Sequence, residues 1–112
     1  MTKDVRLDDL AEDELSDAVA WYERARQGLG AELWDVVWGV LNRIQDAPEL
    51  GTLVSGVDSE LGVRRMLVWR FPFTVVYCEL EREIRVLAIA HAKRRPLYWK
   101  KRLGARPGTV EK

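Results

Sequence analysis

Hydrophobic positions in the first half of the chain recur at helical spacing. Between residues 9 and 26 they follow one another at intervals of three and four, which indicates one face of an amphipathic helix. Asp9, with Glu12 three residues later, resembles a capping box at its start. A second helical pattern covers about 31–46. Because the glycine-containing link at 28–30 is short, the two patterns predict an antiparallel helical hairpin.

The second half of the chain has the pattern of β-strands. Runs rich in Val, Ile, Leu and aromatic residues cover about 62–70, 73–80 and 84–91, and the bends between them are short enough for hairpins. The last run is apolar at both alternating sets of positions, which is typical of a strand covered on both faces. A short strand at 3–8 would join an edge of the sheet or lie beside the last strand. Residues 49–61 are expected to form a loop.

These elements predict an α+β fold, in which an antiparallel helical hairpin packs on one face of a three- to four-stranded antiparallel sheet. The length of 112 residues fits one domain, which we assign to residues 1–103. The Gly- and Pro-containing end, 104–112, is expected to be disordered. We also expect that removing residues 92–112 leaves the helix–sheet core folded.

Composition narrows the class of protein. The chain is 47% hydrophobic and 32% charged, which is ordinary for a globular protein. It has no apolar run long enough to span a membrane and no signal-peptide pattern at its start, so the expected location is the cytoplasm. One cysteine, Cys78, and one histidine, His91, exclude an internal disulfide and a zinc site of the usual ligand count. Neither a metal nor another cofactor is expected.

Charge is divided unevenly along the chain although its net value is zero. Residues 1–60 hold 14 acidic and 5 basic residues, whereas residues 61–112 hold 4 and 13. The segment 91–106 has seven Lys and Arg residues, no acid, and Tyr98 and Trp99 between the bases. Bases interleaved with aromatic rings suit an RNA backbone with splayed bases. The alternative is a solvated basic tail that pairs with the acidic first helix.

Few residue types with catalytic potential are present. His91 ends the last predicted strand, where a lone histidine is either structural or a general acid or base. The sequence has no nucleophile elbow, no phosphate-binding loop and no dinucleotide fingerprint. The helical tryptophans Trp21, Trp34 and Trp38 belong either to the core or to a hydrophobic groove for a partner.

Three segments together resemble the RelE/ParE toxin superfamily of bacterial type II toxin–antitoxin modules, and the ParE-like branch most closely. They are Trp21-Tyr22-Glu23 followed by Gly28-Leu29-Gly30, the bend Arg70-Phe71-Pro72-Phe73 with Tyr77, and His91 with Arg94-Arg95-Pro96 and Tyr98-Trp99. The resemblance covers about residues 5–102. It implies a toxin associated with plasmid stabilisation and growth inhibition. A cognate antitoxin would hold it in a hetero-oligomer, contacting Trp21, Trp34 and Trp38.

The resemblance implies two activities of different class. ParE-like members bind and poison DNA gyrase and are not known as nucleases, whereas RelE-like members cleave mRNA on the ribosome. For the nuclease, the catalytic candidates are His91, Arg65 and Tyr98. Leu67 stands where the nuclease pattern has a basic residue, which favours gyrase binding over mRNA cleavage. A third possibility is a non-toxic relic that only binds the antitoxin. Candidates for target or RNA contact are Arg65, Arg70, Lys93, Arg94, Arg95, Tyr98 and Trp99.

Overall fold

The computed structural model describes residues 2–104 and has two long helices and five strands. The helices and strands are β1 (Asp4–Leu7), α1 (Asp9–Ala25), α2 (Leu29–Asp46), β2 (Thr52–Leu53), β3 (Val63–Leu67), β4 (Phe73–Glu79) and β5 (Glu83–His91). Of the short 3-10 helices, η3 (Lys100–Gly104) follows the last of these strands. The helical hairpin and the three-strand meander are confirmed. Of the segment expected to be disordered, only Gly104 lies within the described residues.

The strands form one sheet in the order β1-β5-β4-β3-β2. The expected α+β class is confirmed, and β1 does lie at an edge beside β5. The expected strand number and direction are wrong in detail, because the sheet has five strands and β1 runs parallel to β5. The extra strand, β2, lies within the segment predicted as a loop and pairs through only two residues with β3.

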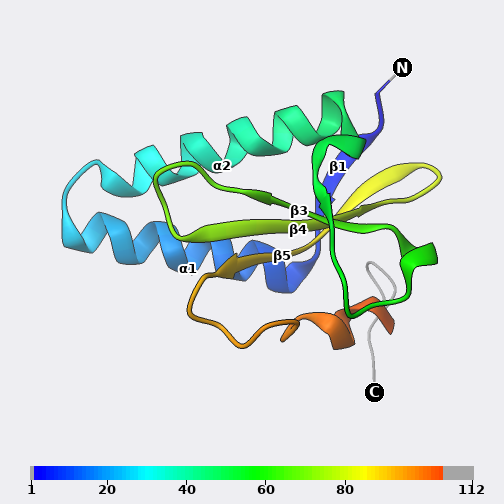
Figure 1. Ribbon diagram of the computed structural model, residues 1–112. Helices are drawn as coiled ribbons and strands as arrows, with labels where there is room; N and C mark the ends of the chain where they lie inside the picture. The colour runs from blue at the N-terminus through cyan, green and yellow to red at the C-terminus, as the bar shows by residue number, and fades with distance from the viewer. Residues whose placement is uncertain (1, 105–112) are drawn as a thin grey trace.

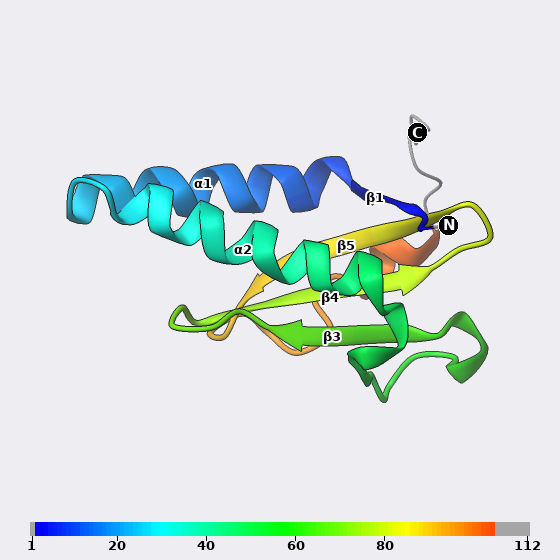
Figure 2. The same ribbon diagram turned by 90° about the horizontal axis from the view of Figure 1, so that it is seen from above.

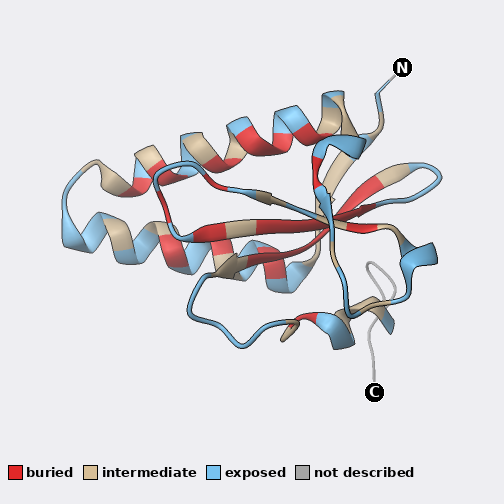
Figure 3. Cartoon of the chain, viewed as in Figure 1, coloured by how far each residue is buried: buried red, intermediate tan, exposed pale blue. Residues whose placement is uncertain are grey.

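The two helices lie side by side and cover one face of the sheet (Figures 1 and 2). The apolar side chains of each helix face the sheet and pack against alternate residues of its strands. The strands β4 and β5 are the most continuously buried part of the chain (Figure 3). Fully buried members of this core include Leu15, Leu33, Ile44, Val75 and Ile84.

A second hydrophobic cluster lies on the opposite face of the sheet. There Trp99, only 4% exposed, packs with the alternate residues Val76 and Cys78 of β4 and with Leu87 and Ala88 of β5. The two-sided apolar pattern of the last strand therefore has its predicted meaning. Trp99 lies within residues 92–112, so removing that segment would take a buried residue out of this second cluster. That the helix–sheet core stays folded without the segment remains a prediction.

The geometry of the link between α1 and α2 requires glycine at positions 28 and 30. Glu23 accepts hydrogen bonds from the main-chain N–H groups of Gly28 and Gly30, at 2.9 and 3.0 Å, and so satisfies free donors at the start of α2. Gly28 has a φ of +91°, which favours glycine. A Cβ atom at Gly30 would lie 2.5 Å from the carbonyl oxygen of Val19, so glycine lets the helices approach closely.

An ion pair fixes the parallel edge of the sheet. The guanidinium of Arg85 donates three hydrogen bonds of 2.8–3.0 Å to the carboxylate of Asp8, and both side chains are almost buried. Asp8 is also the residue before α1, which corrects the sequence prediction of a capping box at Asp9. The Asp8 carboxylate makes no capping hydrogen bond, because it is occupied by Arg85.

Candidate functional site

The C-terminal segment is tied to α1 through the carboxylate of Glu14. Its Oε2 accepts hydrogen bonds from the hydroxyl of Tyr98 at 2.6 Å and from Arg102 Nη2 at 3.0 Å. Its Oε1 accepts from Arg102 Nη1 at 3.1 Å and from the main-chain N–H of Ile89 at 3.0 Å. Glu14 thus joins α1, β5 and the C-terminal segment. We call these three side chains, Glu14, Tyr98 and Arg102, the clasp.

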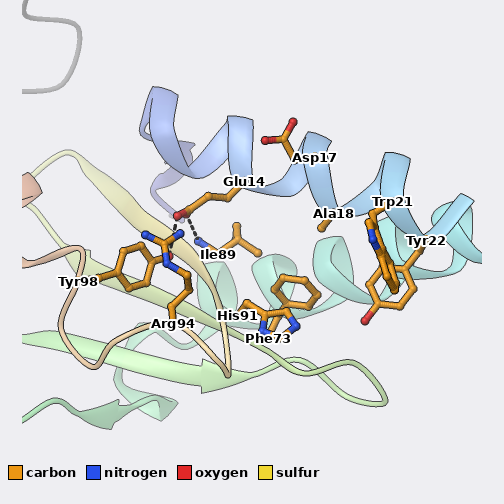
Figure 4. Close-up of a pocket in the computed structure, with 10 residues that line it drawn as sticks. All are labelled: Glu14, Asp17, Ala18, Trp21, Tyr22, Phe73, Ile89, His91, Arg94 and Tyr98. Carbon is orange, nitrogen blue, oxygen red and sulfur yellow. Dashed lines mark hydrogen bonds between the residues drawn. The ribbon is translucent and has the colours of Figure 1, made fainter. Parts of the chain in front are cut away.

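A cavity of about 380 Å³ lies beside the clasp, between α1 and the end of β5 (Figure 4). Its wall on α1 includes Asp17, Trp21 and Tyr22, and its wall on the sheet includes Phe73 and His91. Tyr22 meets Phe73 edge-on with ring centroids 6.3 Å apart, which makes this side largely aromatic. Sequence analysis missed Asp17 and Phe73 as members of the site, because residues on separate elements reveal their proximity only in the fold.

Tyr98 is held as a hydrogen-bond donor. Burial raises the pKa of its hydroxyl above the ordinary value of 10.0, and the hydrogen bond to the Glu14 carboxylate raises it further. The hydroxyl proton is already committed to Glu14, so Tyr98 is a poor general acid or base at neutral pH. Two cations also lie over its ring: Arg94 with its guanidinium carbon 3.8 Å from the ring centroid, and Arg102 at 5.1 Å.

His91 lies at the boundary between two cavities. Its ring meets Phe73 edge-on at a centroid distance of 5.0 Å, and its Nδ1 accepts a 3.0 Å hydrogen bond from the main-chain N–H of Lys93. A neutral imidazole whose Nδ1 is an acceptor carries its proton on Nε2. The hydrogen bond from Lys93 thus occupies Nδ1 and leaves Nε2 as the ring nitrogen that can contact a partner.

Arg65 lies on the opposite face of the sheet from the helices. It lines a groove of about 430 Å³ together with His91, Thr74 and Trp99, and Tyr98 is not among the lining residues. Conversely, the cavity beside the clasp contains His91 and Tyr98 but not Arg65. The structure therefore does not bring the three nuclease candidates into one cavity.

Arg70 lies at the tip of the β3–β4 hairpin. Its φ of +75° is unusual for a residue with a side chain, and its guanidinium donates a 2.9 Å hydrogen bond to Glu32 on α2. The neighbouring side chains Leu67 and Trp69 are 75% and 72% exposed. Arg70 therefore fixes an exposed apolar tip against the helix layer, and its charge is already paired.

The three helical tryptophans occupy two surfaces. Trp21 lines the cavity beside the clasp, whereas Trp38 lines another cavity of about 470 Å³ between α2 and β1. Trp34 lies against Trp38 with ring centroids 5.6 Å apart. Trp21 and Trp34 are 58% and 44% exposed, so each leaves aromatic area for a partner. A partner that covers all three must wrap around the helical hairpin.

The described residues include no group of three or more His, Cys, Asp or Glu side chains arranged to hold a metal ion. None of the helices within residues 2–104 combines the length and apolar character needed to cross a membrane.

Comparison with known proteins gives one kind of match. No family model matches the sequence, and neither does any curated protein. A solved structure, the chromosomal ParDE TA (toxin–antitoxin) system from P. aeruginosa, has a chain with the same fold at a TM-score of 0.69 and 18% identity. The match covers 81% of this chain and 97% of that chain. At this identity the likeness shows the fold alone, which is an α+β fold with two helices on one face of a mixed sheet.

The raised pKa values of three groups in the site and the core predict a loss of stability at alkaline pH. Burial raises the pKa of Tyr98 and Tyr77 above 10.0 and that of Cys78 above 9.0. Between about pH 9 and 11 the unfolded chain releases these protons while the folded chain keeps them, so the free energy of unfolding falls as pH rises. Below about pH 9 this contribution is fully present.

Urea denaturation between pH 7 and 10.5 measures this effect. Each group contributes a slope of at most about 1.4 kcal/mol per pH unit above the pKa of the unfolded chain. Tyr98→Phe removes one titrating proton and is expected to flatten the alkaline decline, although it costs a hydrogen bond at pH 7. Equal slopes for the two proteins would show that the Tyr98 hydroxyl titrates normally.

Proposed function

We propose that this chain is the toxin of a type II toxin–antitoxin pair, that it acts in the cytoplasm by binding DNA gyrase, and that a cognate antitoxin neutralises it in a hetero-oligomer. The fold likeness to a chain of a ParDE system supports the class of protein. The separation of Arg65 from Tyr98, and the engagement of Tyr98 by Glu14, support a binding toxin over a nuclease.

The antitoxin in this proposal covers exposed aromatic surface. Trp21 and Trp34 leave about half of their area open, and the pair Trp34–Trp38 forms a continuous aromatic strip on α2. Burial of such aromatic side chains commonly provides much of the binding energy in protein interfaces. A segment that crosses the helical hairpin would reach both surfaces.

One observation favours the mRNA endonuclease as a second candidate. Arg65 and His91 line the same groove on the face of the sheet opposite the helices, and a cation with a hydrogen-bond donor could hold a phosphate there. Under this alternative the partners would be the ribosome and its mRNA, and Tyr98 would contribute only through the clasp.

Induction of the chain alone in bacteria separates these functions. For a gyrase toxin we expect labelled amino-acid incorporation to continue for the first minutes, while cells filament and show DNA damage, and we expect purified protein to inhibit supercoiling by gyrase. His91→Ala should leave this inhibition within about twofold of wild type. Immediate collapse of incorporation that His91→Ala relieves would instead establish the nuclease. Normal growth with intact protein would indicate a chain that only binds antitoxin.

A further inference from the structure

Four exposed cations of the C-terminal segment surround one shallow hollow. Arg94, Arg95, Lys100 and Lys101 line a depression of about 840 Å³, and we call these four side chains the basic cradle. Among the described residues, none of the four has a carboxylate oxygen within 4.0 Å, in contrast to Arg102 beside them. Within the described part of the segment, the expected ion pairing with the acidic first helix is therefore seen for Arg102 alone, and the four cradle side chains form no ion pair with a described carboxylate.

The cradle is held in place by the folded core. Trp99 lies between Arg95 and Lys100 in the sequence and is buried on the sheet. Arg102, the residue after Lys101, is fixed by Glu14, and its carbonyl oxygen accepts a 2.7 Å hydrogen bond from the buried Arg85. The Arg94 guanidinium rests over the ring of Tyr98. A charged segment fixed in this way loses little conformational entropy when it binds, unlike a flexible tail.

The aromatic residues of this segment are not free to stack on bases. Trp99 is buried, and Tyr98 has two guanidinium groups over its ring and its hydroxyl bound to Glu14. Recognition of single-stranded nucleic acid depends on stacking of bases on open aromatic faces. Because neither aromatic ring is open for stacking, only the cations of this segment are available for binding, and they suit the phosphate groups of a regular backbone.

From these observations we propose that the basic cradle binds the phosphate backbone of double-stranded DNA without reading its sequence. The four side chains lie on a turn and on the five-residue η3 helix, too short an element to enter a groove as a recognition helix does. If the chain acts on gyrase, the cradle would contact the DNA duplex that gyrase holds. This part of the inference rests on the function proposed above.

Fluorescence anisotropy with labelled 20-base-pair duplexes of two unrelated sequences tests the cradle, using the full chain between 50 and 200 mM salt. We expect equal affinity for the two duplexes and a slope of log K against log salt of about −3 to −4, as for three to four phosphate contacts. The double variant Lys100→Glu/Lys101→Glu should reduce the magnitude of this slope by about 2 and weaken binding at least about tenfold.

The matched control is Arg43→Glu/Arg82→Glu, which changes the net charge equally at two exposed positions outside the cradle. It should bind within about twofold of wild type. The proposal is overturned if the control loses as much affinity as the cradle variant, if no duplex binds at 50 mM salt, or if single-stranded RNA of the same length binds more tightly than the duplex.

A supercoiling assay on the same samples separates this inference from the proposed function. If the chain inhibits gyrase but binds no duplex, the proposal that the cradle binds DNA is overturned and the gyrase proposal stands. Duplex binding by a chain that leaves gyrase active would confirm the cradle and overturn the gyrase proposal. Inhibition that falls with Lys100→Glu/Lys101→Glu but not with the control would support both.

Discussion

Replacing Trp99 with alanine is expected to lower the free energy of unfolding by about 3–5 kcal/mol, the usual cost of removing a large buried aromatic side chain. Trp99 is buried in the second hydrophobic cluster, so its truncation would leave a cavity against neighbours such as Val76 and Leu87. The loss is a large part of the 5–15 kcal/mol that stabilises an ordinary domain. Chemical denaturation followed by circular dichroism measures it.

The chain offers a matched control in Trp69, which is 72% exposed at the β3–β4 tip. Trp69→Ala removes the same atoms from a site with little packing, and should change stability by no more than about 0.5 kcal/mol. Similar losses for the two variants would contradict the assignment of Trp99 to the core.

The second large effect is expected for Glu14→Gln. This change keeps the shape of the side chain but removes the negative charge that pairs with Arg102, whose side chain is only 11% exposed. Burial lowers the pKa of Arg102 and its bonds to Glu14 raise it. Without Glu14 the guanidinium would still be charged at neutral pH, because arginine does not lose its proton in proteins, and it would then lack its partner. Removing one member of a buried pair costs about 3–5 kcal/mol, and the residual exposure places our expectation near 3 kcal/mol.

Glu12→Gln is the control for this variant, because Glu12 lies on the same helix and is exposed. Its expected effect is below about 1 kcal/mol, from its favourable interaction with the helix dipole. Beyond stability, Glu14→Gln should release the C-terminal segment. Faster hydrogen exchange at residues 98–102 in this variant, with no change in the Glu12 variant, would confirm the clasp. Unchanged exchange in both would contradict it.

Local sequence patterns were sufficient for much of the fold. The spacing of apolar residues in α1 and α2 is a property of each helix alone, and so is the two-sided apolar pattern of β5. The direction of β1 could not be predicted in this way, because four residues of strand pattern contain no information on which way their neighbour runs. The two residues of β2 are too few to give any pattern at all.

The C-terminal segment shows why the site was harder to predict than the fold. Its charges dominate the sequence, so Trp99 was assigned to a target surface although it packs in the core. Glu14 did not stand out among the acids of the first helix, and its partners Tyr98 and Arg102 lie 84 and 88 residues away in the chain. Such pairings depend on how whole elements pack, and a single sequence contains no local signal for them.

The position of β5 has a consequence for the time at which the fold can form during synthesis. β5 lies between β1 and β4, yet it is the last strand of residues 2–104 to be made. Its ion pair with Asp8, near the start of the chain, closes a loop of 77 residues. Closing a long loop costs entropy that only the contacts made afterwards offset. The helical hairpin and β1 leave the ribosome early, and β1 must wait for β5, the strand with which it pairs. An activity that depends on the sheet therefore begins only after residue 91 has been translated.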